Sequence, residues 1–140
     1  MRIAVIDGQG GGLGKAIIER LRKELPDQIG IIALGTNAMA TSLMIKAGAN
    51  EGASGENAIS YTCSKVDVII GAIGIIVANS MLGEFTPRMT QAIADSPAKK
   101  FLIPLNRCNI EVIGTNGETL PRLIDSLIVS IKYHLKDKDS

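Results

Sequence analysis

Short apolar runs alternate along the chain with segments in which apolar residues recur every three or four positions. A run of five or six mostly aliphatic residues, bounded by glycine or polar residues, is typical of a buried strand. Five such strands are expected, at residues 2–6, 29–34, 66–71, 100–105 and 110–114. Because these runs are nearly continuous rather than alternating, they favour a parallel sheet that is covered on both faces.

The segments between these runs predict helices. Asn37 is a favourable N-cap, and Thr86 followed by Pro87 is typical of a helix start, because the first helical position needs no N–H donor. Helices are expected at about residues 13–25, 38–47, 55–64, 87–95 and 119–135. The run 73–77 fits both a strand continued past a kink and the start of a helix.

The alternation of strands and helices predicts an α/β fold. We expect a three-layer, Rossmann-like arrangement with a mostly parallel sheet of about five strands and helices on both faces. The chain has 140 residues, which suits one domain. This domain is expected to cover residues 1–135, and a polar, frayed tail to follow at 136–140.

A glycine-rich loop follows the first predicted strand and has five glycines in seven residues. At the carboxyl end of a parallel strand, such a loop lets the backbone approach a ligand closely. It also directs N–H groups and the helix dipole at an anion. The sequence therefore predicts a site for a small phosphate-bearing ligand here. Its expected residues are Asp7, Gly8, Gln9, Gly10, Gly11, Gly12, Leu13 and Gly14.

Two known patterns resemble this loop. The short-chain dehydrogenase pattern, Thr-Gly-x-x-x-Gly-(Ile/Leu)-Gly, matches at Gly8, Gly12, Leu13 and Gly14. Asp7 stands in place of its threonine, and the resemblance implies NAD(P) as cofactor. Residues 11–15 resemble the P-loop core of ParA-like ATPases, but Ala16 stands where a hydroxyl must hold Mg²⁺. We therefore favour a dinucleotide or another nucleotide over ATP hydrolysis.

Four further positions at the same edge of the sheet are candidate ligand contacts. NAD-binding domains usually have an acidic residue at the end of the second strand. Here Thr36 and Asn37 occupy that position and the next carboxylate is Glu51, which weakens the NAD prediction. Thr36 and Asn37 could contact a phosphate or cap the following helix. Asn106 and Arg107 follow the fourth predicted strand, and Arg107 could clamp a phosphate.

The catalytic residues, if any exist, are not identified by the sequence. Tyr61 and Lys65 have the Tyr-x-x-x-Lys spacing of short-chain dehydrogenases, but they come far too early in the chain, so we interpret the match as coincidence. Glu56 is a candidate general base and Cys108 a candidate nucleophile, although a helix-terminal acid and a buried thiol are the more ordinary interpretations. His134, the single histidine, is expected at the surface. No cluster has metal-ligand spacing.

Composition narrows the classes of partner. The net charge is +1 and aromatic residues make up 3%, which disfavours nucleic acid. The most apolar stretch, residues 68–78, has about half of the ~20 residues that span a bilayer, so no membrane partner is expected. Two cysteines without C-x-x-C spacing suit a cytoplasmic protein with reduced thiols. A homodimer through the apolar last helix is also expected.

Four segments resemble a small bacterial family of unknown function that occurs largely in anaerobic, Firmicutes-type bacteria. They are residues 3–12, 35–41, 55–59 and 103–108. The resemblance covers nearly the whole chain, but the family carries no known activity, so it transfers no catalytic residue. Three functions stay open: a nucleotide- or dinucleotide-binding module, a small NAD(P)-dependent oxidoreductase, and a structural or interaction subunit without a ligand.

Overall fold

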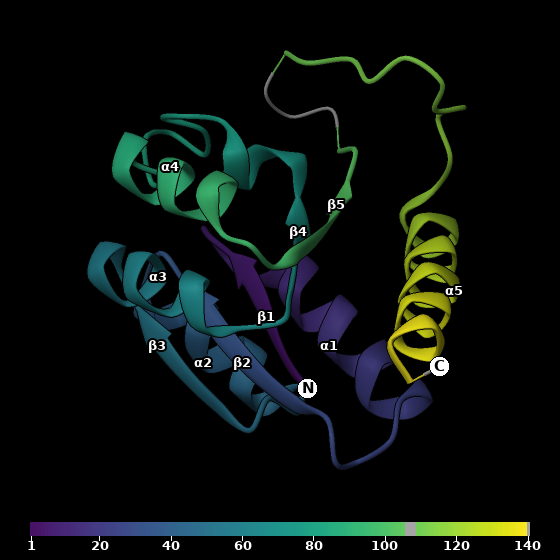
Figure 1. Cartoon of the computed structure of the whole chain (residues 1–140). Helices are drawn as coiled ribbons and strands as arrows, with labels where there is room; N and C mark the ends of the chain where they lie inside the picture. The colour runs from purple at the N-terminus through teal and green to yellow at the C-terminus, as the bar shows by residue number, and fades with distance from the viewer. Residues whose placement is uncertain (106–108, 140) are drawn as a thin grey trace.

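The computed structural model describes residues 1–105 and 109–139. Five strands form one sheet in the order β3-β2-β1-β4-β5, and all neighbouring pairs are parallel (Figure 1). The strands are β1 (Arg2–Asp7), β2 (Gly30–Gly35), β3 (Glu51–Ser54), β4 (Val68–Ala72) and β5 (Lys99–Ile103). Parallel pairing throughout confirms the predicted α/β, Rossmann-like class.

Helices cover both faces of this sheet and make it the middle of three layers (Figure 1). One face packs against α1 (Gly12–Glu24), α2 (Ala38–Lys46) and α5 (Leu120–Asp139). The other face packs against α3 (Glu56–Thr62) and α4 (Pro87–Asp95). Two short 3₁₀ turns, η1 (Cys63–Lys65) and η2 (Ile73–Ile76), lie before and after β4.

The central strand β1 shows why its sequence is continuously apolar. Ile3 and Val5 point into the core that α1 and α5 cover, whereas Ala4 and Ile6 point into the core on the α3–α4 side. Successive strand residues face opposite sides of a sheet, so a strand covered on both faces needs apolar residues at every position. These four side chains are at most 1% exposed.

The strand order places a switch point beside β1. From β1 the chain moves outward to β2 and β3, and then crosses back to β4 on the other side of β1. The segments that follow β1 and β4 therefore diverge, and the crevice between them is the usual ligand position in open α/β sheets. The glycine loop follows β1 and lies at this point.

One predicted strand is wrong and one strand was missed. Residues 110–114 are irregular and end in a turn, and the fifth strand is instead β3, in a stretch that the sequence analysis left as loop. All four residues of β3 are exposed, so the strand has no apolar pattern to detect. It forms because its backbone pairs with β2, from Ile32–Glu51 to Gly35–Ser54.

Three other local predictions have definite outcomes. The ambiguous run 73–77 contains the 3₁₀ turn η2. The tail expected to fray after residue 135 is helical through Asp139, and Lys136 and Lys138 in the last turn of α5 complement its dipole. His134 is half-buried rather than at the surface, with its ring 5.7 Å from that of Phe101. No helix within residues 1–105 and 109–139 is long and apolar enough to cross a bilayer.

Candidate functional site

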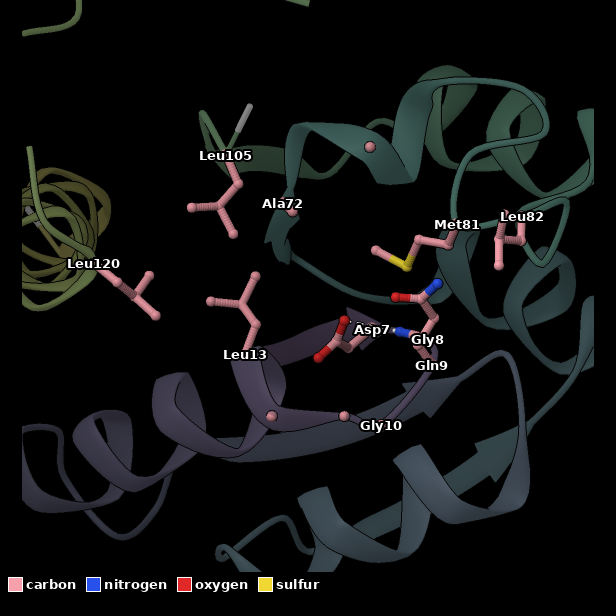
Figure 2. Close-up of a pocket in the computed structure, with 13 residues that line it drawn as sticks. Asp7, Gly8, Gln9, Gly10, Leu13, Ala72, Met81, Leu82, Leu105 and Leu120 are labelled. Carbon is pink, nitrogen blue, oxygen red and sulfur yellow. Dashed lines mark hydrogen bonds between the residues drawn. The ribbon is translucent and has the colours of Figure 1, made fainter. Parts of the chain in front are cut away.

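A cavity of about 650 Å³ lies at the carboxyl ends of β1 and β4 (Figure 2). This volume falls in the range of small-molecule sites. The lining includes seven of the eight predicted loop residues, Asp7, Gly8, Gln9, Gly10, Gly11, Gly12 and Leu13. The rest of the lining was not predicted from the sequence and consists of Ala72, Gly74, Met81, Leu82, Leu105 and Leu120.

A tight turn connects β1 to α1. The N–H of Gly11 donates to the carbonyl of Gly8 at 3.0 Å, and the N–H of Lys15 then donates to Gly11 at 2.9 Å. Gly11 has φ +79°, and a Cβ there would lie 2.7 Å from Cα of Ala40. Only glycine fits this position, because the backbone is left-handed and α2 lies against it. The turn sets α1 to begin at the pocket.

Gly14 serves the packing of α1 and does not line the pocket. A Cβ on Gly14 would overlap the Sδ of Met44 and lie 2.9 Å from its Cγ, and it would lie 3.1 Å from Cβ of Asp7. The missing side chain therefore lets α1 approach β1 and α2 closely. This close approach of helix and strand is one of the roles of glycine in dinucleotide-binding loops.

Gly10 and Gly12 have a different environment. No atom lies within 4 Å of the position where a Cβ would project from either residue, and both line the cavity. Neither their N–H groups nor that of Leu13 has a hydrogen-bond acceptor among the described residues. Gly10 in the loop and Gly12 and Leu13 in the first turn of α1 thus leave three N–H donors on residues that line the cavity, near the positive end of the helix dipole.

Asp7 fixes the shape of the loop. Its Oδ1 accepts the N–H of Gly8 at 2.8 Å, and its Oδ2 accepts the N–H of Gly14 at 2.7 Å. The side chain is 5% exposed, and Figure 2 shows its carboxylate directed toward the cavity. Asp7 was predicted as a residue of the ligand site, and the two bonds show that it shapes the turn.

Glu84 is a polar residue of this region that the sequence analysis missed. It comes from the loop between η2 and α4, and its Oε1 accepts the Gln9 N–H at 2.9 Å, the Asn37 amide at 3.1 Å and the Thr36 hydroxyl. Burial raises the pKa of Glu84, but these bonds outweigh it, and the net pKa lies below the ordinary value. A charged carboxylate thus lies at the end of β2, where none was expected.

Of the two roles predicted for Thr36 and Asn37, the structure shows helix capping, by Asn37. Asn37 caps α2, since its Oδ1 accepts the Ala40 N–H at 2.8 Å, and its Nδ2 donates to the Gln9 carbonyl at 2.9 Å. Neither residue lines the cavity. The other two predicted contacts, Asn106 and Arg107, lie outside the described residues, as does Cys108.

The candidate catalytic side chains that the structure describes, those of Glu56, Tyr61 and Lys65, do not line the cavity. Tyr61 is exposed, and the Lys65 ammonium lies 4.6 Å from the centre of its ring, as a cation–π pair. Glu56 accepts the Thr86 hydroxyl at 2.6 Å and lies 3.6 Å from Arg88, so it joins the start of α3 to the start of α4. Within the described part of the chain, no group of His, Cys, Asp and Glu could hold a metal ion.

Residues 2–136 match the sequence profile of a family described as Domain of unknown function (DUF3842). The match spans nearly the whole chain, so the protein belongs to this family. The comparison with curated proteins finds no match.

Proposed function

We propose that this member of the DUF3842 family is a nucleotide- or dinucleotide-binding module whose glycine loop holds a phosphate group of the ligand. One observation carries the proposal. The N–H groups of Gly10, Gly12 and Leu13 have no acceptor among the described residues, and they line a cavity of about 650 Å³. Phosphate oxygens are the natural acceptors for donors at a helix N-terminus.

The two open glycines support the same function. Gly10 and Gly12 place backbone, without side chains, against the cavity, so a phosphate can approach the N–H groups to hydrogen-bond distance. Neither glycine is needed for the local fold, because neither has a positive φ and neither Cβ position is occupied. A ligand contact explains glycine at both positions.

The walls of the cavity suit the organic part of a nucleotide or cofactor. Leu13, Leu105 and Leu120 come from three segments and point toward one another across the space (Figure 2). Ligand sites commonly combine such apolar walls with a few polar groups that fix orientation. Because Tyr61, Lys65 and Glu56 lie away from the cavity, binding is the function that the geometry supports best, ahead of oxidoreduction.

Thermal unfolding with added ligand tests the proposal. The panel comprises NAD, NADP, FMN, coenzyme A, ATP with Mg²⁺ and inorganic phosphate. A ligand at ~100 times its Kd adds ~2.7 kcal/mol of stability, which raises Tm by several degrees for a chain of this size. At least one phosphate compound should do so.

A matched pair of variants locates the site. Gly12→Val fills the open space beside the three N–H groups and should abolish the Tm shift. Gly30→Ala is the control, because its Cβ would lie no closer than 3.8 Å to any atom and it is at the other end of the sheet. A flat panel at millimolar ligand would contradict the proposal, and so would full binding by Gly12→Val.

A further inference from the structure

The glycine loop has one flank toward β2 and one toward β4, and only the flank toward β4 opens into the cavity. In dinucleotide-binding α/β folds the ligand crosses the loop at the switch point, and one half lies on the β2 side of β1 while the other lies on the β4 side. In this protein the flank toward β4 and β5 is the cavity, which reaches Ala72 at the end of β4 and Leu105 after β5. The flank toward β2 is filled by side chains.

Gly8 shows how completely the β2 flank is filled. A Cβ on Gly8 would lie 2.8 Å from the Thr36 hydroxyl, 3.0 Å from Sδ of Met81 and 3.2 Å from Oε1 of Glu84. Figure 2 shows the Met81 side chain beside Gly8 and Gln9, at the end of the cavity opposite Leu120. A ligand half that passed over Gly8 toward β2 would meet these three side chains.

Met81 and Glu84 belong to a loop that is held in place at both ends. Glu84 bonds to Gln9, Thr36 and Asn37 across the gap between β1 and β2. Next to Glu84, Phe85 is fully buried in the core on the α3–α4 side. At the other end, the hydroxyl of Ser80 donates to the carbonyl of Gly74 at 2.5 Å.

The backbone of this loop is left-handed at four positions. Asn79, Met81 and Leu82 have φ of +66°, +54° and +57°, and Gly83 has φ +87°. Left-handed conformations are unfavourable for side-chain-bearing residues and persist only where surrounding contacts impose them. The hydrogen bonds of Glu84 to Gln9, Thr36 and Asn37 are such contacts, so Glu84 holds the loop against the β2 flank.

We propose that this loop closes the β2 half of the site, so that the cavity takes a phosphate monoester with a largely apolar or planar body and excludes dinucleotides. This inference rests on the proposed phosphate site and narrows its ligand class. It departs from the NAD(P) cofactor that the loop sequence alone implied, because that cofactor needs both flanks.

Calorimetric titration of the wild-type protein with two matched ligand pairs tests the inference. FMN and FAD share one half and differ by an adenylate, and so do nicotinamide mononucleotide and NAD. The monoester of at least one pair should bind at least tenfold more tightly than its adenylylated partner. A dinucleotide that binds as tightly as its own monoester, or more tightly, overturns the inference and leaves the phosphate site standing.

Opening the loop gives a second, independent test. The double variant Met81→Ala, Glu84→Ala removes the hydrogen bonds that hold the loop and the methionine side chain beside Gly8. It should bring the affinity for the dinucleotide to within threefold of that for the monoester. Glu51→Ala is the control, because Glu51 is exposed on the edge strand and pairs with Arg2. An unchanged preference in the double variant overturns the role of the loop. If no member of either pair binds and the thermal-unfolding panel is flat as well, the proposed function itself fails, and this inference with it.

Discussion

The carboxylate of Asp7 accepts the backbone N–H of Gly14 at 2.7 Å and so joins the end of β1 to the first turn of α1. Its other oxygen accepts the N–H of Gly8 at 2.8 Å. One buried side chain thus satisfies two N–H groups of the loop, while Glu84 accepts that of Gln9 and the carbonyl of Gly8 accepts that of Gly11. The glycine loop is therefore held in its shape before any ligand binds.

Replacing Asp7 by Asn should destabilise the protein. An amide has one oxygen in place of two, so either Gly8 or Gly14 loses its acceptor in a buried environment. A buried donor left without a partner costs roughly 1–3 kcal/mol. Urea unfolding should show this loss. Asp125→Asn, which removes an exposed ion pair with Arg20, is the control and should cost less than about 1 kcal/mol. Equal effects would show that the Asp7 bonds add nothing specific.

Gly14→Ala and Gly12→Ala should have opposite effects on stability. The new methyl group at position 14 overlaps Met44, and overpacking of this kind costs roughly 1–3 kcal/mol. At position 12 the methyl group meets no atom, and alanine favours the helix, so stability should stay equal or rise by up to about 1 kcal/mol. Denaturant midpoints measure both. A destabilised Gly12→Ala variant would contradict the open environment of that residue.

Glu84 should contribute stability that depends on pH. Its pKa in the folded protein lies below the ordinary value of 4.5, so the contribution is fully present above that pH and is lost as the pH falls through the folded-state pKa. Glu84→Gln keeps the shape but removes the charge. The stability difference between wild type and Glu84→Gln, measured by urea unfolding from pH 7 to pH 3, should shrink below pH 4.5. Glu118→Gln, in an exposed loop, is the reference for losing one carboxylate. A difference that grows on acidification would reverse the assigned sign.

Cys63 should be unreactive in the folded protein. Burial raises the pKa of its thiol to about 11, from an ordinary value of 9.0, although Lys100 opposes the shift. Only the thiolate reacts, and a shift of this size lowers its fraction about a hundredfold at pH 8. In a Cys108→Ser background, an aromatic disulfide reagent should label Cys63 slowly in buffer and completely in denaturant. Rapid labelling in buffer would contradict its burial.

The class of fold could be predicted from the sequence because burial on both faces leaves a local trace. The strands β1, β2 and β4 are aliphatic runs, β5 ends in three apolar residues, and Asn37 and Thr86 carry their capping function in their own side chains. The edge strand β3 could not be predicted, since its exposed residues have no apolar pattern and only pairing with β2 makes them a strand. Residues 110–114 have the apolar composition of a strand but pair with no strand.

The candidate site also has features that the sequence predicts and features that only the tertiary structure shows. The sequence by itself determined that a glycine loop ends β1, because five glycines in seven residues are a local signal with a local cause. Only the tertiary structure decided which glycines face the cavity, which serve packing, and which flank is open. Gly12 and Gly14 look alike in the sequence, but one faces empty space and the other faces Met44. Glu84 reaches the end of β2 from 48 positions beyond Thr36, so no spacing along the chain announces it. Contacts between distant segments depend on how the strands are ordered in the sheet, and that order follows from packing the whole chain.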